Sequence, residues 1–455
     1  MAKTAWKNYN ENQLRELNQL SYEYVDFISK CKTERECVAE MVKRLESLNY
    51  KSLESLDSVK TGVKIYSVHM GKTLVIYNIG SDPIEKGMNI LGAHIDSPRL
   101  DVKQKPVYEK RETAYFDTHY YGGIKKYQWV TIPLAIHGVV VKKSGEVINI
   151  NIGENENDPV FFISDLLVHL SGEQLEKKAA KVIDGEALDV TVASIPLTEG
   201  EEEDVKANLL KILYDGYNIE EDDFLSAELE VVPAGRAREA GFDRGMILGY
   251  GQDDRSCAYT SFKAITESEA LKRTACCILS DKEEIGSVGA TGMHSRFFEN
   301  SLAELINLMG DFSELKLRRA LSNSLMLSSD VSSAYDSLYS AVFDEKNTAY
   351  TGRGVVFNKF TGARGKSGSN DANPEFIAKI RSILDSENIT FQTAELGKVD
   401  RGGGGTIAYI LANYGMNVID CGVPVLNMHA PWEAISKADI YEAKRCYTAF
   451  LNKAE

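Results

Sequence analysis

The segment MNILGAHID, residues 88–96, is apolar on both faces until it reaches His94. A strand of this kind is typical of the centre of a sheet that helices cover on both sides. Such α/β folds place their chemistry where polar residues follow the carboxyl end of a strand. The segment therefore predicts an α/β fold, with His94 and Asp96 at the edge of the sheet where a site would form.

Four later segments also end in a residue of a type that binds metals. They are Asp253 in GQDDRS, Glu284 in DKEEIGS, Asp330 in SSDVSSA and His429 in NMHAPWE. Imidazole and carboxylate groups are the ligands of a catalytic zinc that keeps one position open for water. Glu283, beside Glu284, is a second carboxylate that could act as a base toward such a water. With His94, these segments predict a site for two zinc ions.

Taken singly, each residue also fits an ordinary structural role. The alternatives are a strand-end histidine tied to Asp96, a solvated acidic turn at Glu283–Glu284, an ion pair of Asp253 with Arg255, a helix N-cap at Asp330 and a core histidine at His429. Because all five segments occur together and in this order, the metal site explains them better than five separate structural roles do.

The residue pattern that indicates secondary structure changes at two places along the chain. Residues 10–48 have helical spacing, residues 103–235 contain short β-rich pieces, and the α/β pattern returns from about residue 236. His94 precedes the β-rich stretch and the other four candidate ligands follow it. We therefore expect a catalytic domain in two parts, 1–102 and 236–455, with an inserted β-rich domain at 103–235.

Composition narrows the class of protein. The chain has 455 residues and a net charge of −15, without the basic patch that a nucleic-acid partner requires. No stretch approaches the roughly 18 apolar residues of a membrane span, and the N-terminal residues lack the apolar core of a signal peptide. The seven cysteines form no CxxC motif, so we expect a reduced, cytoplasmic protein with Cys276 and Cys277 in a buried strand. The acidic runs Glu201–Asp204 and Glu220–Asp223 are typical of solvated surface.

Two further features have less specific patterns. His169 lies in the apolar run SDLLVHL of the β-rich stretch, where a packed strand histidine and a contact with an active site are both open. The glycines Gly402–Gly405 lack the lysine and the spacing of a phosphate-binding loop. They indicate instead a place where the backbone approaches a substrate closely.

The chain resembles the M18 family of metalloaminopeptidases, the aspartyl aminopeptidases, over essentially its whole length. The matching motifs are GAHIDSPRLD, YGG at Tyr121–Gly123, GQDDRS, DKEEIGS, SSDVSSA, GGGT at Gly403–Thr406 and NMHAP. The resemblance implies an α/β fold with a mixed sheet flanked by helices, the fold of dinuclear zinc exopeptidases, and an inserted β-rich domain that serves in dimerisation. It also implies a homododecamer built from dimers.

The resemblance assigns a role to each site residue. It places His94 and Asp330 on one zinc ion, Glu284 and His429 on the other, and Asp253 as the bridge between them. It makes Glu283 the general base and acid, lets Asp96 orient His94, and implies a cis peptide bond between Asp253 and Asp254. His169 matches a histidine of the inserted domain that acts as a substrate contact or as an additional zinc ligand.

The expected activity is removal of N-terminal residues from peptides with a free amino group, with two zinc ions that cobalt or manganese could replace. Acid-specific members have a histidine where this chain has Ser333, and the basic partner of an acidic side chain could be Lys359, Arg364 or Arg401. Preference for acidic residues is therefore open. The alternatives are another metallohydrolase on the same scaffold, a deacylase or carboxypeptidase, or a non-catalytic oligomeric binding protein.

Overall fold

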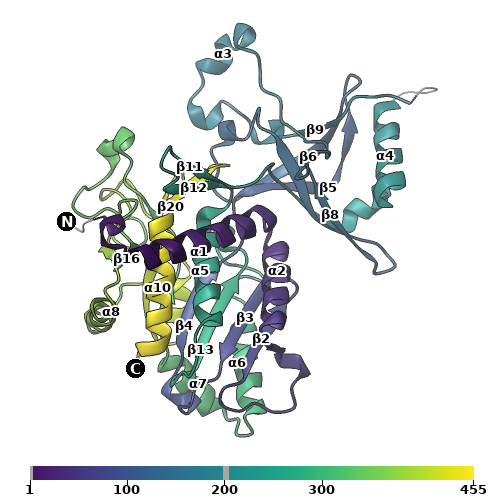
Figure 1. Ribbon diagram of the computed structural model, residues 1–455. Helices are drawn as coiled ribbons and strands as arrows, with labels where there is room; N and C mark the ends of the chain where they lie inside the picture. The colour runs from purple at the N-terminus through teal and green to yellow at the C-terminus, as the bar shows by residue number, and fades with distance from the viewer. Residues whose placement is uncertain (1–3, 198–203) are drawn as a thin grey trace. The chain divides into compact units, whose positions relative to one another are not determined.

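The chain folds into two units (Figure 1), and the computed structural model describes residues 4–197 and 204–455. Within the described residues, the first unit contains residues 4–96, 237–428 and 433–455, and the second contains the stretch from Ser97 to Arg236 together with residues 429–432. The expected boundary after residue 102 would cut strand β5 (Arg99–Glu109), which lies wholly in the second unit.

The first unit is built on a nine-stranded sheet in the order β1-β2-β3-β13-β4-β14-β18-β16-β17. The strands are β1 (Lys51–Ser52), β2 (Lys64–His69), β3 (Thr73–Asn78), β4 (Asn89–His94), β13 (Ala275–Ser280), β14 (Leu325–Ser328), β16 (Val355–Asn358), β17 (Phe391–Thr393) and β18 (Asn417–Gly422). β13, β4, β14 and β18 run parallel, whereas β3 and β16 run antiparallel to the outer strands of that group. The prediction of a mixed sheet is confirmed.

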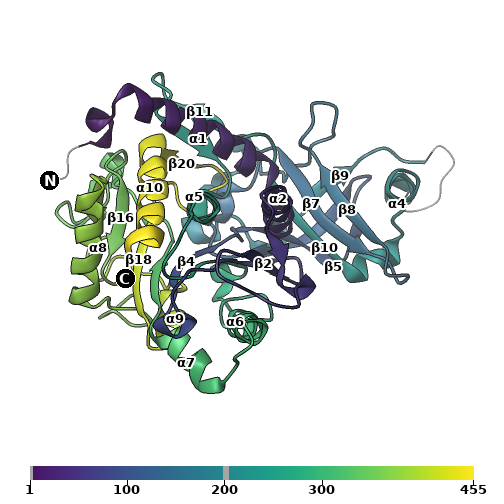
Figure 2. The same ribbon diagram turned by 60° about the horizontal axis from the view of Figure 1, so that its bottom comes forward.

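Helices cover both faces of this sheet, as Figure 2 shows. One face carries α1 (Glu11–Lys30), α2 (Glu34–Ser47), α5 (Gln252–Thr266), α8 (Pro374–Ser386) and α10 (Lys437–Lys453); the other carries α6 (Phe297–Leu308), α7 (Glu314–Ser322) and α9 (Ala408–Ala412). In β4, Leu91 and Ala93 join the first core and Ile90 joins the second. This double burial is why residues 88–96 are apolar on both faces.

A smaller five-stranded sheet completes the first unit, in the order β11-β12-β20-β19-β15. Its strands are β11 (Arg238–Ala240), β12 (Met246–Gly249), β20 (Glu433–Ser436), β19 (Pro424–Leu426) and β15 (Ser332–Ser333). Residues 416–430 divide between β18 of the large sheet and β19 of the small one. Pro424 has no N–H to continue the ladder of β18, so the pairing changes there.

The second unit contains a six-stranded antiparallel sheet in the order β8-β7-β10-β5-β6-β9. Besides β5, its strands are β6 (Ala114–Tyr121), β7 (Leu134–Val141), β8 (Val147–Ile152), β9 (Val190–Ala193) and β10 (Ala227–Pro233). Helix α4 (Asp204–Tyr217) packs against this sheet. The unit is β-rich.

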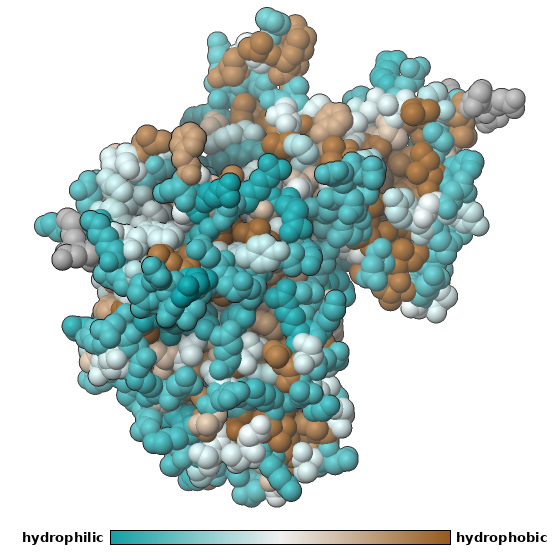
Figure 3. Space-filling view, viewed as in Figure 1, coloured by the Kyte–Doolittle hydropathy of each residue, from teal (hydrophilic) through white to brown (hydrophobic). Residues whose placement is uncertain are grey.

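The segment around His169 is not a packed strand, which corrects one of the two interpretations of SDLLVHL. His169 lies in an exposed 3-10 turn (Val168–Leu170), and the short helix α3 (Gly172–Leu175) follows it. Val168 is 71% exposed and Leu170 is 69% exposed. Figure 3 shows apolar residues gathered on this projecting segment, at the top of the view. An apolar run forms a buried strand only where a neighbouring strand pairs with it, and among the described residues no strand pairs with Val168–Leu170.

Several composition-based expectations can be compared with the structure. All seven cysteines are free and buried, and Cys276 and Cys277 lie in β13 as predicted. Among the described residues, no helix is long and apolar enough to cross a membrane. Residues 220–222 are exposed, whereas Glu201–Glu203 lie outside the described residues.

Candidate metal centre

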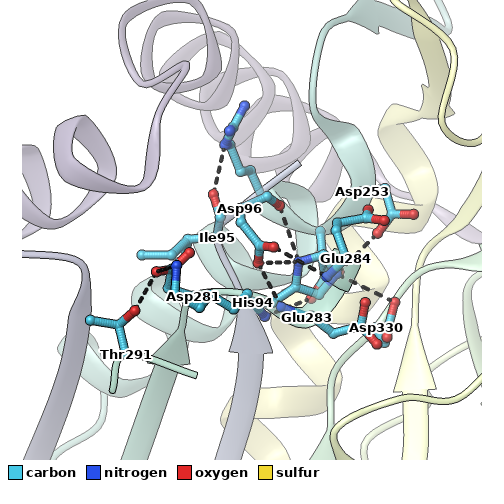
Figure 4. Close-up of polar contacts among 12 residues, drawn as sticks. His94, Ile95, Asp96, Asp253, Asp281, Glu283, Glu284, Thr291 and Asp330 are labelled. Carbon is cyan, nitrogen blue, oxygen red and sulfur yellow. Dashed lines mark hydrogen bonds and ion pairs between the residues drawn. The ribbon is translucent and has the colours of Figure 1, made fainter. Parts of the chain in front are cut away.

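Four of the five candidate ligands gather at one edge of the nine-stranded sheet (Figure 4). His94 ends β4, Glu284 follows β13 in a 3-10 turn (Glu283–Ile285), Asp330 follows β14, and Asp253 lies in the first turn of α5. Because β13, β4 and β14 are parallel and in register, their carboxyl ends meet: Ser280 pairs with His94, and Ser328 with Gly92. Strand order therefore brings together residues that are far apart in the sequence.

The side chains lie within the range of a shared cation. His94 Nε2 lies 3.2 Å from Asp253 Oδ1 and 4.0 Å from Asp330 Oδ1. One ligand atom from each of His94, Asp253 and Glu284 lies within 4.8 Å of the others, and the same holds for His94, Asp254 and Asp330. Nitrogen and carboxylate donors at this spacing are suited to a divalent metal.

Asp96 makes polar contacts with both the histidine and the glutamate turn. Its carboxylate is fully buried, with Oδ1 3.2 Å from His94 Nδ1. Oδ1 also accepts the backbone N–H of Glu283 and Oδ2 accepts that of Glu284, each at 3.1 Å. An acceptor at Nδ1 favours the tautomer with the lone pair on Nε2, the nitrogen that faces Asp253 and Asp330.

The first turn of α5 has an unusual backbone. The Asp253–Asp254 peptide bond is cis, as the resemblance implies. Asp253 donates its N–H to Glu433 Oε2 at 3.2 Å, and Asp254 Oδ2 accepts the N–H of His94 at 3.3 Å. Arg255, the alternative partner of Asp253, donates to the backbone carbonyls of Ile95 and Lys32. The two aspartates thus attach α5 to β20 and β4.

Electrostatics at this edge indicate a need for positive charge. Burial, followed by the charge of Asp254, raises the pKa of Asp330 well above its usual range, and burial followed by the charge of Asp253 does the same for Asp254. Burial lowers the pKa of His94, but hydrogen bonds to Asp253 and Asp96 outweigh it, so this pKa lies well above 6.5. Crowded carboxylates hold protons unless a cation offsets their repulsion. The donor set therefore fits a bound metal.

The fifth candidate ligand, His429, belongs to the second unit. Its Nδ1 lies 2.8 Å from the carbonyl oxygen of Gly123, in the YGG motif. A carbonyl only accepts, so Nδ1 carries the proton and the lone pair lies on Nε2. His429 is thus in the tautomer that suits ligation through Nε2, and its place beside the other four ligands stays a prediction.

The glycine run approaches the protein's own backbone. A β-carbon on Gly403 would lie 2.2 Å from Gly362 O, and one on Gly402 would lie 2.5 Å from Leu396 O. Gly403 also has φ +143°, which L side chains rarely adopt. At these two positions the close neighbours are Gly362 and Leu396 of the protein itself, and the approach to a substrate stays a prediction.

The basic candidates for an acidic side chain lie in different settings. Lys359 is paired with Asp371. Arg364 lines a cavity of about 240 Å³ together with Lys366, Lys398, Glu395 and Asp400. Arg401 is exposed.

Some residues of this edge had no assigned role from the sequence. Asp254 follows a predicted ligand, Asp281 is the first residue of DKEEIGS, and Glu433 follows the NMHAPW stretch. Their position inside or beside the motifs was the available signal. The sequence could not show what each residue contacts. Asp254 accepts the N–H of His94, Asp281 accepts the hydroxyl of Thr291, and Glu433 accepts the N–H of Asp253.

Comparisons with known proteins identify the family of the chain. The family model described as aminopeptidase I zinc metalloprotease (M18) matches residues 27–451. A probable M18 family aminopeptidase 1 of Clostridium acetobutylicum is 61% identical over 455 residues, covering 99% of this chain and 98% of the relative.

Solved structures show the same fold over the whole chain. The crystal structure of an M18 family aminopeptidase from Thermotoga maritima has a TM-score of 0.96 and 43% identity, covering 100% of this chain and 99% of that one. The mApe1 dodecamer of S. cerevisiae has a TM-score of 0.76 at 19% identity, covers 96% of this chain and 97% of that one, and shares the fold. With the family model matched across both units, the chain belongs to the M18 family of zinc metalloproteases and is an aminopeptidase of that family.

Proposed function

We propose that this protein is a dinuclear zinc aminopeptidase whose metals are held by His94, Asp253, Glu284, Asp330 and His429. His94 and Asp330 would bind one ion, Glu284 and His429 the other, and Asp253 would bridge them. The observation that supports this assignment is the meeting of the first four at the carboxyl edge of parallel strands, with His94 Nε2 3.2 Å from Asp253 and 4.0 Å from Asp330. Cobalt or manganese could replace zinc on the same donors.

Bound zinc would polarise the scissile carbonyl and lower the pKa of the attacking water. Glu283 is half-buried in the same turn as Glu284, with its backbone N–H bonded to Asp96. As general base, the Glu283 carboxylate takes a proton from the water whose oxygen attacks the carbonyl carbon. It then gives the proton to the leaving nitrogen as the carbon–nitrogen bond breaks. Asp96 keeps His94 in the required tautomer.

The substrate is a peptide with a free N-terminal amine. The cluster of carboxylates attracts positive charge. A free amine, protonated or bound to a metal, is therefore favoured over a blocked terminus. We extend the proposal to acidic N-terminal residues through Arg364. Of the three basic candidates, Lys359 is paired with Asp371, whereas Arg364 lines a cavity. A side chain of opposite charge would bind there by a charge-assisted hydrogen bond.

The second unit is proposed as the surface for self-association. In its segment of residues 160–175, Val168 is 71% exposed, and Leu170 and Leu175 are each 69% exposed. An apolar cluster on the surface is typical of a protein interface. The S. cerevisiae mApe1 relative is a dodecamer, which supports a homododecamer built from dimers for this chain. His169 lies in the same segment, where it would contact a substrate or serve as a further zinc ligand.

The decisive experiment combines substrates, a chelator and one variant. Aminoacyl p-nitroanilides of Asp, Glu, Lys and Leu, with free and acetylated amines, are hydrolysed with and without 1,10-phenanthroline. We expect cleavage of free-amine substrates only, loss with the chelator and recovery with zinc. A general base contributes about 10²–10⁴-fold, so Glu283→Gln should lose at least that factor with normal metal content. Glu375→Gln, at the exposed start of α8, is the matched control.

Cleavage of the acetylated substrates would favour another metallohydrolase on the same scaffold, such as a deacylase. Retention of most activity by Glu283→Gln at normal metal content would remove Glu283 from its role. If no substrate is cleaved with zinc present, a non-catalytic oligomeric binding protein becomes the better interpretation.

A further inference from the structure

The loop between β13 and α6 carries both glutamates of the site and is closed by its own hydrogen bonds. It leaves the sheet at Asp281 and returns at Gly292, which forms a parallel bridge with Asp281. Inside it, Ser287 N donates to Lys282 O at 2.6 Å. A β-carbon on Gly292 would lie 2.3 Å from Ser287 O, so the loop has little room to rearrange.

A buried hydroxyl–carboxylate pair closes this loop. Thr291 Oγ1 donates to Asp281 Oδ2 at 2.5 Å, and the Asp281 residue is fully buried while Thr291 is 3% exposed. The carbonyl of Thr291 also accepts the hydroxyl of Thr73 at 2.6 Å, from β3. Thr291 is therefore fixed through both its side chain and its backbone. Figure 4 shows the pair to the left of Asp96 and the two glutamates.

The surroundings of Asp281 disfavour the charged form of its carboxylate. Burial, followed by the charges of Glu34 and Asp96, raises its pKa to about 6, while the Thr291 hydroxyl opposes the shift. Lys282 Nζ lies 3.3 Å away and offsets part of the charge. Since a charge-assisted hydrogen bond is shorter and more directional than a neutral one, the pair orients Thr291 more tightly than an apolar contact would.

Two carboxylates thus hold the loop at different points. Asp96 binds the N–H groups of Glu283 and Glu284, and Asp281 binds the residue where the loop returns to the sheet. Catalytic groups need placement within a fraction of an ångström, which requires support from the surrounding residues. We propose that Asp281 and Thr291 are positioning residues that hold this loop, and through it the Glu283 carboxylate, in the geometry for proton transfer. The inference rests on the proposed role of Glu283.

The test uses Thr291→Val, which is nearly isosteric but removes the hydroxyl, and Thr291→Ser, which keeps it. Thr274→Val is the matched control: Thr274 is 2% exposed, accepts a hydrogen bond from Gly80 N and precedes β13 at its other end. We expect Thr291→Val to lower kcat by about 10-fold or more with KM nearly unchanged. Thr291→Ser should recover most of kcat, and Thr274→Val should keep it.

Hydrogen exchange on the metal-free protein gives a second, independent readout. Amides of residues 283–290 should exchange faster in Thr291→Val, but not in Thr291→Ser or Thr274→Val. Asp281→Asn keeps an acceptor for the hydroxyl without the buried charge and covers the case in which Thr291→Val does not fold. Amides of the loop should exchange more slowly in Asp281→Asn than in Asp281→Ala.

Equal kcat for Thr291→Val and the parent, equal losses for Thr291→Val and Thr291→Ser, or an equal loss for Thr274→Val would each overturn the inference. Failure of Glu283 as the base is distinguishable, because Glu283→Gln would then remain active while loop exchange in the Thr291 variants still reports the closure.

Discussion

Asp96→Asn is the most direct perturbation of the candidate metal site. The carboxylate accepts three contacts, with Oδ1 facing His94 Nδ1 and Glu283 N, and Oδ2 facing Glu284 N. An amide has one oxygen, so its best orientation turns that oxygen to His94 and Glu283. Its NH₂ group then faces the N–H of Glu284, and one accepting bond becomes a donor–donor contact.

The size of the effect follows from these bonds. A hydrogen bond to a charged group is worth about 1.5–3 kcal/mol. Loss of one such bond, with the two remaining bonds no longer charge-assisted, should cost about 2–3 kcal/mol at the site. With about 1.4 kcal/mol for each factor of ten, kcat/KM should fall about 30- to 150-fold. Part of this loss should be a lower affinity for zinc, because His94 and Glu284 are both affected.

Asp439→Asn is the matched control. Asp439 is fully buried and accepts the N–H groups of Gly352 and Gly354 on its two oxygens, each at 2.7 Å. The amide meets the same donor–donor conflict there, so both variants should lose thermal stability. Zinc content by mass spectrometry and kcat/KM on the best p-nitroanilide are measured together. A kcat/KM within about threefold of the parent for Asp96→Asn, or an equal loss for Asp439→Asn, would refute the reasoning.

Two further variants address other parts of the first unit. Burial raises the pKa of Asp420 from 3.8 to about 7, against the hydrogen bond from Thr406, so the folded state binds this proton more tightly than the unfolded state. Its contribution to stability is present below about pH 4 and is lost as the pH rises through about 7. In thermal melts, the Tm of Asp420→Asn relative to that of the parent should therefore rise from pH 5 to pH 8. A Tm difference that does not depend on pH would contradict this. A β-carbon on Gly422 would lie 1.8 Å from Asp330 O. Gly422→Ala should thus weaken zinc binding about 10-fold in a chelator competition, whereas Gly216→Ala, with nothing within 4 Å of its β-carbon, should not.

Much of the fold could be predicted because its signals are local. The double burial of β4 shows as an apolar run, α1 and α2 show as helical spacing, and Cys276 and Cys277 sit in an apolar segment that became β13. Local pattern does not decide features that depend on a distant partner. Residues 416–430 divide between two sheets at Pro424, and the apolar residues around His169 are exposed.

The candidate site shows the same division. The sequence named His94, Asp253, Glu284 and Asp330 because motif residues of metal-binding type follow strands. It gave no role to Asp281 or Thr291, because neither residue type implies a partner and their hydrogen bond forms only when the loop closes.

The sequence by itself determined the residue types of the site, the α/β and β-rich stretches and the family resemblance. Each of these depends only on local patterns and motifs. The tertiary structure decided which atoms meet. Parallel pairing of β13, β4 and β14 brings His94 Nε2 to 4.0 Å from Asp330 and places both oxygens of Asp96 on the N–H groups of Glu283 and Glu284. Such contacts depend on strand register and on the path of loops, and these are set by the packing of the whole unit.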